Sequence, residues 1–191
     1  MSCNTAFIKL VDNAWGKRPE GFTAVGSEAR EVFGLGSWSI GVATKDPQVR
    51  DPATGDRNLR GGNAIGQGDI AASPLVIASV TATVRNAGFR QPILIPKLHQ
   101  VSAERPISAT TAQSLQNMMR ATAHSGTAAP RVADLPGVGA KTGTAEVSDS
   151  ANNGWFAAYD DHLAVAAEVA GGGTGVDSAG YLVRDILLAD R

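Results

Sequence analysis

Residues 139–170 read GAKTGTAEVSDSANNGWFAAYDDHLAVAAEVA, three short segments with strand character separated by polar residues. The separating residues, 148–150 and 160–161, are serine and aspartate, which favour tight turns. Turns this short join antiparallel neighbours. The stretch therefore predicts a three-stranded antiparallel meander, with strands over Gly139–Val147, Gly154–Tyr159 and Leu163–Ala170.

The chain on both sides of this stretch carries helix signals. Ser73-Pro74 combines a serine cap with a proline in the first turn of a helix that we expect to run to Gly88. Ser2-Cys3-Asn4-Thr5 similarly predicts a cap before apolar residues at helical spacing. The other expected helices span Thr23–Phe33, Ala109–His124 and about Asp177–Leu188. This order predicts an α+β fold, an antiparallel sheet flanked by helices.

Two segments have weaker patterns. Residues 44–63 are polar and rich in Asp-Pro and Gly, so we expect a long surface loop there. Residues 91–101 are apolar but interrupted by proline, which predicts a strand-like segment. The sequence contains no internal repeat and no clear second domain, and we interpret residues 1–191 as parts of a single domain.

The composition excludes several classes of protein. Hydrophobic residues make up 43% of the chain, which is typical of a globular domain. The formal net charge is −1, so the charge balance gives no indication of nucleic-acid binding. No apolar run approaches the roughly 20 residues of a membrane helix, and no signal peptide follows Met1. We therefore expect any anchor or export signal outside this sequence. Cys3 is the single cysteine and the histidines are scattered, so no disulfide and no metal site are expected.

Lys141, Thr142 and Gly143 lie in the first predicted strand and suit the binding of a carboxylate. A lysine facing a cleft supplies a cation, and the neighbouring hydroxyl donates a hydrogen bond to the same group. A glycine lets a ligand backbone lie against the strand. The segment 139–145 resembles the Lys-Thr-Gly motif of penicillin-binding proteins and serine β-lactamases. The resemblance implies that the backbone N–H of Thr144 contributes to an oxyanion hole.

The segments around this motif extend the resemblance. In the family the strand after Lys-Thr-Gly holds an aromatic pair, matched here by Trp155 and Phe156, which we interpret as core residues. Residues 66–75, GQGDIAASPL, resemble the Gly-Gln-Gly…Thr-Pro-Leu signature of class B penicillin-binding proteins, with Ser73 in place of threonine. Residues 125–128, SGTA, are similar to the segment that these proteins carry before Lys-Thr-Gly. The composition most resembles the actinobacterial penicillin-binding protein A group.

Ser2-Cys3-Asn4 is similar to the family's Ser-x-Asn motif, which lies across the cleft from Lys-Thr-Gly. The resemblance implies that Ser2 relays protons between the lysines of the site. It also implies that the Asn4 amide holds a substrate amide and the general-base lysine. Without the family resemblance, an isolated Ser-x-Asn is more often a simple helix cap, formed here by Ser2 or Asn4, than a catalytic motif.

The nucleophile of the family is the serine of a Ser-x-x-Lys motif, and this sequence contains none. The residues three positions before its five lysines are Ala6, Ala14, Val42, Leu94 and Val138. We therefore expect residues 1–191 to be the C-terminal portion of a transpeptidase domain, with the nucleophile-bearing N-terminal portion absent from this sequence. The isolated chain is then expected to be inactive, with exposed faces that pair with that N-terminal portion or with a second copy.

The resemblance implies a serine acyl transferase for the complete protein. It would crosslink D-Ala-D-Ala stem peptides of peptidoglycan, be acylated by β-lactams and need no cofactor. A membrane anchor outside this sequence would hold the domain on the cell-wall side.

Other functions share parts of the same pattern. A D,D-carboxypeptidase, a β-lactamase and a β-lactam sensor all carry Lys-Thr-Gly, and a non-catalytic binding module stays open because the nucleophile is absent. The Gly-Gln-Gly segment favours the transpeptidase. Residues 137–142 depart from a Walker loop, since Ala140 precedes the lysine where that loop needs glycine. Gly66-x-Gly68 lacks the strand and the acidic residue of a dinucleotide site.

Overall fold

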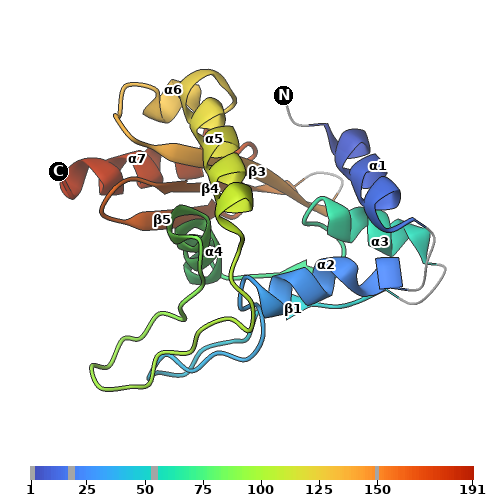
Figure 1. Cartoon of the computed structure of the whole chain (residues 1–191). Helices are drawn as coiled ribbons and strands as arrows, with labels where there is room; N and C mark the ends of the chain where they lie inside the picture. The colour runs from blue at the N-terminus through green and yellow to red at the C-terminus, as the bar shows by residue number, and fades with distance from the viewer. Residues whose placement is uncertain (1–2, 17–19, 53–55, 149–150) are drawn as a thin grey trace. The chain divides into compact units, whose positions relative to one another are not determined.

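The computed structural model describes residues 3–16, 20–52, 56–148 and 151–191 of the chain. The contacts between residues divide the chain into two compact units. Unit 1 comprises Met1–Ala72 and Arg90–Arg105, and unit 2 comprises Ser73–Phe89 and Pro106–Arg191. Figure 1 shows the helices and strands of both units.

The sheet of unit 2 is the predicted antiparallel meander. Its strands β3 (Gly139–Ser148), β4 (Ala151–Tyr159) and β5 (Ala164–Val169) lie in the order β3-β4-β5. The second strand begins three residues earlier than predicted. Of the first predicted turn, residues 149–150 lie outside the described residues. The second turn is confirmed: the Asp160 carboxylate accepts hydrogen bonds from the N–H groups of His162 at 2.9 Å and Leu163 at 3.0 Å.

Four helices accompany this sheet in the described part of unit 2: α4 (Pro74–Asn86), α5 (Ala109–Ser125), α6 (Ala129–Val132) and α7 (Ala179–Ala189). The predicted serine cap of α4 is confirmed, because Ser73 Oγ accepts from Val76 N–H at 3.3 Å. Ser108 caps α5 in the same way, with Thr111 N–H at 3.1 Å. The short helix α6 carries no apolar periodicity and was not predicted.

Alternation along β4 directs side chains to the two faces of the sheet. Phe156 is fully buried and faces α7, since a Cβ added to Gly180 would lie 3.1 Å from its ring. Tyr159, three residues on, faces α5, where its hydroxyl donates to the Gln116 carbonyl at 3.4 Å. Figure 1 shows α5 and α7 on opposite faces of the sheet. The expected α+β architecture, a sheet flanked by helices, is therefore present.

Unit 1 contains the helices α1 (Asn4–Trp15), α2 (Glu20–Glu31) and α3 (Arg57–Ala64), with a short strand pair of β1 (Gln48–Val49) and β2 (Ile70–Ala71). The prediction of a continuous loop over 44–63 is wrong, because β1 and α3 lie within it. The helix α3 begins where the Asp56 carboxylate accepts from Leu59 N–H at 3.0 Å. Its buried residues are the polar Arg60 and Asn63, so its sequence has no apolar stripe to indicate a helix.

The strand-like segment predicted over 91–101 is also corrected. An isolated β-bridge joins Arg90 to Ser102 at the two ends of this region. Between them, residues 91–101 form an irregular loop. The loop lies beside residues 35–46 of the same unit, as Figure 1 shows. The buried Gln91 side chain accepts from Ser39 N–H at 2.8 Å, and Leu94 N–H donates to the Ile40 carbonyl at 2.8 Å. Pro92 and Pro96 lack the N–H groups that a continuous strand ladder needs.

Gly175, in the connection between β5 and α7, provides a test of this packing. A Cβ at this position would lie 1.8 Å from the Trp155 carbonyl oxygen and 2.6 Å from that of Gly143, and backbone atoms cannot move aside cheaply. We expect Gly175→Ala to lower the free energy of unfolding by about 3 kcal/mol. Gly88→Ala is the control, since it meets open space, and should change stability by less than about 1 kcal/mol. Urea denaturation measures the free energy of unfolding of both variants. Equal values for Gly175→Ala and Gly88→Ala would contradict the close packing at Gly175.

The ion pair between Arg184 of α7 and Asp134 makes a second prediction. Two guanidinium nitrogens of Arg184 donate to the Asp134 carboxylate at 2.6 and 2.8 Å. These bonds favour the charged carboxylate and lower the pKa of Asp134 to about 2. The pair therefore stabilises the fold above the ordinary pKa of 3.8, and its contribution is lost as pH falls towards 2. NMR titration of the Asp134 carboxyl should find the low pKa, and Arg184→Gln should return it towards 3.8. The same pKa in the variant and the unsubstituted chain would show that Arg184 does not pair with Asp134.

Candidate active site

The four predicted residues of the Lys-Thr-Gly segment lie consecutively on β3. Lys141, Thr142, Gly143 and Thr144 pair with Ala157, Phe156, Trp155 and Gly154 of β4. The partner strand therefore carries the expected aromatic pair directly opposite the motif. Within the described residues β3 is an edge strand, because β4 is its one sheet neighbour. An edge strand leaves one side of the motif accessible to a ligand.

Lys141 presents a cation at this edge. Its side chain is exposed and its ammonium donates to the Thr142 carbonyl at 2.5 Å. Protein atoms around the stem displace enough water to lower the pKa of Lys141 from its ordinary 10.5. Among the described residues no carboxylate forms an ion pair with this ammonium. The positive charge is therefore available to an anionic ligand.

The Thr142 hydroxyl has a partner that the sequence did not indicate. Its Oγ1 lies 2.7 Å from Oγ1 of Thr127, an exposed residue in the turn between α5 and α6. In the sequence, the Ser-Gly-Thr-Ala segment at residues 125–128 stands out only by its resemblance to the family. No local pattern connects residues 127 and 142, because the contact depends on how α5 packs beside β3.

Gly143 and Thr144 complete the motif. A Cβ at Gly143 would lie 3.1 Å from Cβ of Trp155 across the ladder, so this position is crowded on the side of β4. Thr144 is exposed, opposite the buried Gly154. The segment thus combines one ammonium, one half-buried hydroxyl and a small residue over three positions, which suits the carboxylate end of a peptide lying along the strand.

Asn4, the asparagine of the predicted Ser-x-Asn motif, is the first residue of α1 and is exposed. The cap position of this helix is Cys3, and it makes no side-chain cap hydrogen bond. Asn4 therefore does not cap the helix. Ser2 lies outside the described residues. Asn4 belongs to unit 1 and Lys141 to unit 2. That Ser2 and Asn4 act together with Lys141 stays a prediction.

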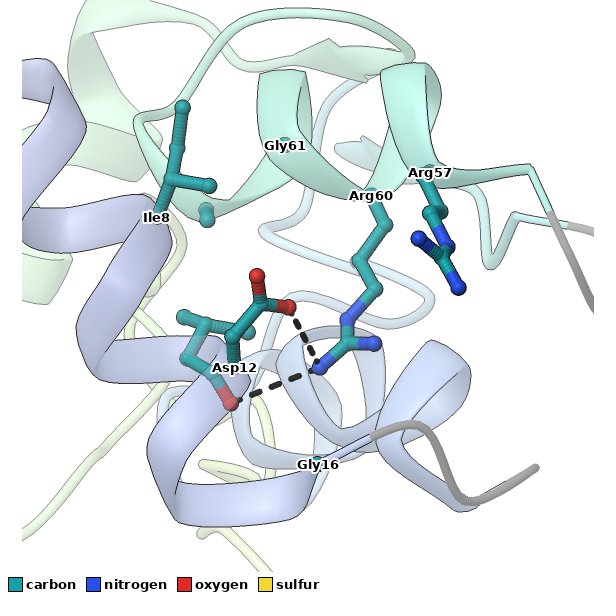
Figure 2. Close-up of a pocket in the computed structure, with 8 residues that line it drawn as sticks. Ile8, Asp12, Gly16, Arg57, Arg60 and Gly61 are labelled. Atoms are coloured by element: carbon teal, nitrogen blue, oxygen red, sulfur yellow. Dashed lines mark hydrogen bonds and ion pairs between the residues drawn. The ribbon is translucent and has the colours of Figure 1, made fainter.

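A buried arginine of unit 1 holds the helix that begins at Asn4. The Arg60 residue is 4% exposed and its guanidinium donates to Asp12 at 3.1 Å and to the Val11 carbonyl at 3.4 Å, both on α1. It also lies over the ring of Phe22 at 4.9 Å. Figure 2 shows Arg60 extending from α3 towards Asp12 at the edge of a cavity of about 330 Å³. The cavity is lined by Ile8, Val11, Asp12, Gly16, Arg57, Arg60, Gly61 and Ala64.

Two features are absent from the described part of the chain. No group of three or more His, Cys, Asp or Glu side chains is placed to hold a metal ion there. None of the helices there combines the length and the apolar character needed to span a bilayer.

This chain is similar to known proteins in both sequence and fold. The family model of the penicillin binding protein transpeptidase domain matches residues 1–188. The peptidoglycan D,D-transpeptidase PbpA of Mycolicibacterium smegmatis is 29% identical over 206 residues, which cover 94% of this chain and 39% of that protein. Penicillin-binding protein A from M. tuberculosis, solved as an imipenem acyl-enzyme complex, matches with a TM-score of 0.79 and 27% identity. That match covers 99% of this chain and 45% of the other.

A more distant structure agrees in fold. Pseudomonas aeruginosa PBP2, solved in complex with WCK 5153, has a TM-score of 0.75 at 20% identity, covering 97% of this chain and 46% of that one. This chain spans about two-fifths of the length of the curated relative and less than half of each structure. The match of the family model over nearly the whole length shows that this chain belongs to the penicillin-binding protein transpeptidase domain family.

Proposed function

We propose that this chain works as part of a peptidoglycan D,D-transpeptidase, and that both units belong to one transpeptidase domain. The observation that carries the proposal is the edge strand β3, where two consecutive residues offer groups that can bind a carboxylate. Lys141 supplies an ammonium that forms no ion pair with a described carboxylate, and Thr142 supplies a hydroxyl. The family model spans both units, which supports a single domain. The similarity to a protein named D,D-transpeptidase favours this activity over the other reactions that use a Lys-Thr-Gly motif.

The proposed substrate is a stem peptide that ends in D-Ala-D-Ala. A serine hydroxyl attacks the carbonyl of the penultimate D-Ala, and the terminal D-Ala leaves as its amine takes up a proton. An amine of a neighbouring stem then attacks the acyl-enzyme ester and releases the serine. Lys141 and Thr142 bind the terminal carboxylate, and the Thr144 N–H stabilises the oxyanion. Ser2 relays protons and Asn4 holds the substrate amide.

The sequence of 191 residues contains no Ser-x-x-Lys motif. The nucleophilic serine of this scheme therefore comes from residues outside it. Those residues form the N-terminal half of the domain and are the main partner of this chain. Exposed apolar side chains support a partner: Phe7 and Leu10 on α1 and Leu182 and Ile186 on α7 are each at least 45% exposed. The isolated chain is therefore inactive and prone to self-association. In the cell, an anchor outside this sequence holds the domain on the cell-wall side.

Replacement of Lys141 tests the proposed site in the full-length protein that carries this chain. Lys141→Ala removes a charged hydrogen-bond donor to the carboxylate of penicillin and should lower the second-order rate of acylation about 10- to 100-fold. Lys45→Ala removes an exposed lysine of unit 1 and is the control. The rate is measured by labelling with a fluorescent penicillin. Equal rates for Lys141→Ala and the unsubstituted protein would remove Lys141 from the site.

The absence of a nucleophile is tested on the 191-residue chain itself. Intact-mass spectrometry after incubation with imipenem should show no adduct, whereas M. tuberculosis penicillin-binding protein A, whose imipenem acyl-enzyme is known, serves as the positive control. An adduct that maps to a serine of this chain would show that the chain contains its own nucleophile.

A further inference from the structure

Thr127 is a hydroxyl residue at the candidate site to which the proposed mechanism gives no role. We propose that Thr127 is a positioning residue: it donates a hydrogen bond to Thr142 and thereby directs the single proton of the Thr142 hydroxyl to the carboxylate of the substrate. The inference rests on the proposed function, because it assigns a second hydroxyl to the same carboxylate site. The observation that carries it is the 2.7 Å separation of the two Oγ1 atoms.

The turn that carries Thr127 is held firmly in place. Ala128, the next residue, is fully buried in the core of unit 2, and its N–H donates to the Thr122 carbonyl at 3.2 Å. A Cβ at Gly126, the preceding residue, would lie 2.8 Å from Cα of Thr122, so the chain passes very close to the end of α5. Thr127 is thus fixed between a buried anchor and a close backbone contact, and its exposed position results from this geometry rather than from a mobile loop.

The helix that follows the turn is also secured. Arg131 of α6 donates from Nε to the Val176 carbonyl at 2.8 Å, and its guanidinium lies 3.8 Å from the centre of the Tyr181 ring. Val132 of the same helix is 1% exposed. These contacts tie α6 to α7 and its preceding loop. The position of Thr127 relative to β3 is therefore set by the core of unit 2.

Proton counting fixes the direction of the bond when a carboxylate is bound. Each hydroxyl has one proton and can accept from two directions. A carboxylate only accepts, so the Thr142 proton must go to the ligand. The contact with Thr127 then persists only if Thr127 donates its own proton to Thr142. Thr127 has no proton left for the ligand, so it acts through Thr142.

Two physical effects follow from such a chain of donors. The Thr142 hydroxyl is oriented before the ligand arrives, so less rotational freedom is lost on binding. A hydroxyl that accepts a hydrogen bond is also a better donor, because successive hydrogen bonds polarise one another. Both effects strengthen binding of the carboxylate and leave other parts of a ligand unaffected. A purely structural role for Thr127 would instead affect all ligands alike.

The test uses the full-length protein that carries this chain, with benzylpenicillin and its methyl ester as probes. Thr127→Val keeps the shape of the side chain and removes the hydroxyl, and Thr127→Ser is the matched control that keeps it. We expect Thr127→Val to slow acylation by benzylpenicillin about 3- to 10-fold, as for loss of one neutral hydrogen bond. The rate with the methyl ester should change less than about twofold, and Thr127→Ser should keep both rates within about twofold. Mass spectrometry of the acyl-enzyme gives the rates.

A double variant tests whether Thr127 acts through Thr142. Thr127→Val added to Thr142→Val should slow benzylpenicillin no further than Thr142→Val alone. An unchanged rate in Thr127→Val, an equal loss with acid and ester, or a full additional loss in the double variant would each overturn the inference. Failure of benzylpenicillin to acylate the unsubstituted protein would instead overturn the proposed function. Thermal unfolding midpoints of the variants identify any loss that comes from misfolding.

Discussion

The candidate site depends on the register between β3 and β4. In this register Lys141 and Thr142 stand opposite Ala157 and Phe156, and their side chains point to opposite faces of the sheet. A slip of one residue would exchange those faces and separate Thr142 from Thr127. The register is maintained by burial on both faces, because Phe156 packs against α7 while Tyr159 packs against α5. The same packing therefore stabilises unit 2 and aligns the polar groups of its edge.

The helices of unit 2 contribute geometry to the site as well as burial. The end of α5 and the short helix α6 place the Thr127 turn beside the edge strand, and Gly175 lets the connection to α7 approach the carbonyls of Trp155 and Gly143. Both features need a close backbone approach, which glycine permits. The polar groups at this edge are thus held in position by the packing of unit 2.

Two buried polar side chains connect separate segments of unit 1. Arg60 links α3 to α1, and Gln91 joins two irregular loops through backbone hydrogen bonds. Both side chains are almost completely buried, and both hydrogen-bond to backbone groups of other segments. This arrangement explains why patterns of apolar residues predicted unit 1 less well than unit 2.

The sheet of unit 2, the serine cap of α4 and the Lys-Thr-Gly strand could be predicted from the sequence alone. In each case the signal is local: alternation with polar turns, Ser73 before Pro74, and a motif at consecutive positions. Helix α3 could not be predicted, because its buried residues are the polar Arg60 and Asn63. The loop over 91–101 was predicted as a strand because it is apolar, although its prolines interrupt any strand ladder. The contact between Thr127 and Thr142, 15 residues apart in sequence, became visible in the folded chain alone. Such a contact follows from the packing of α5 and α6 in a shared core, and no short stretch of sequence encodes it.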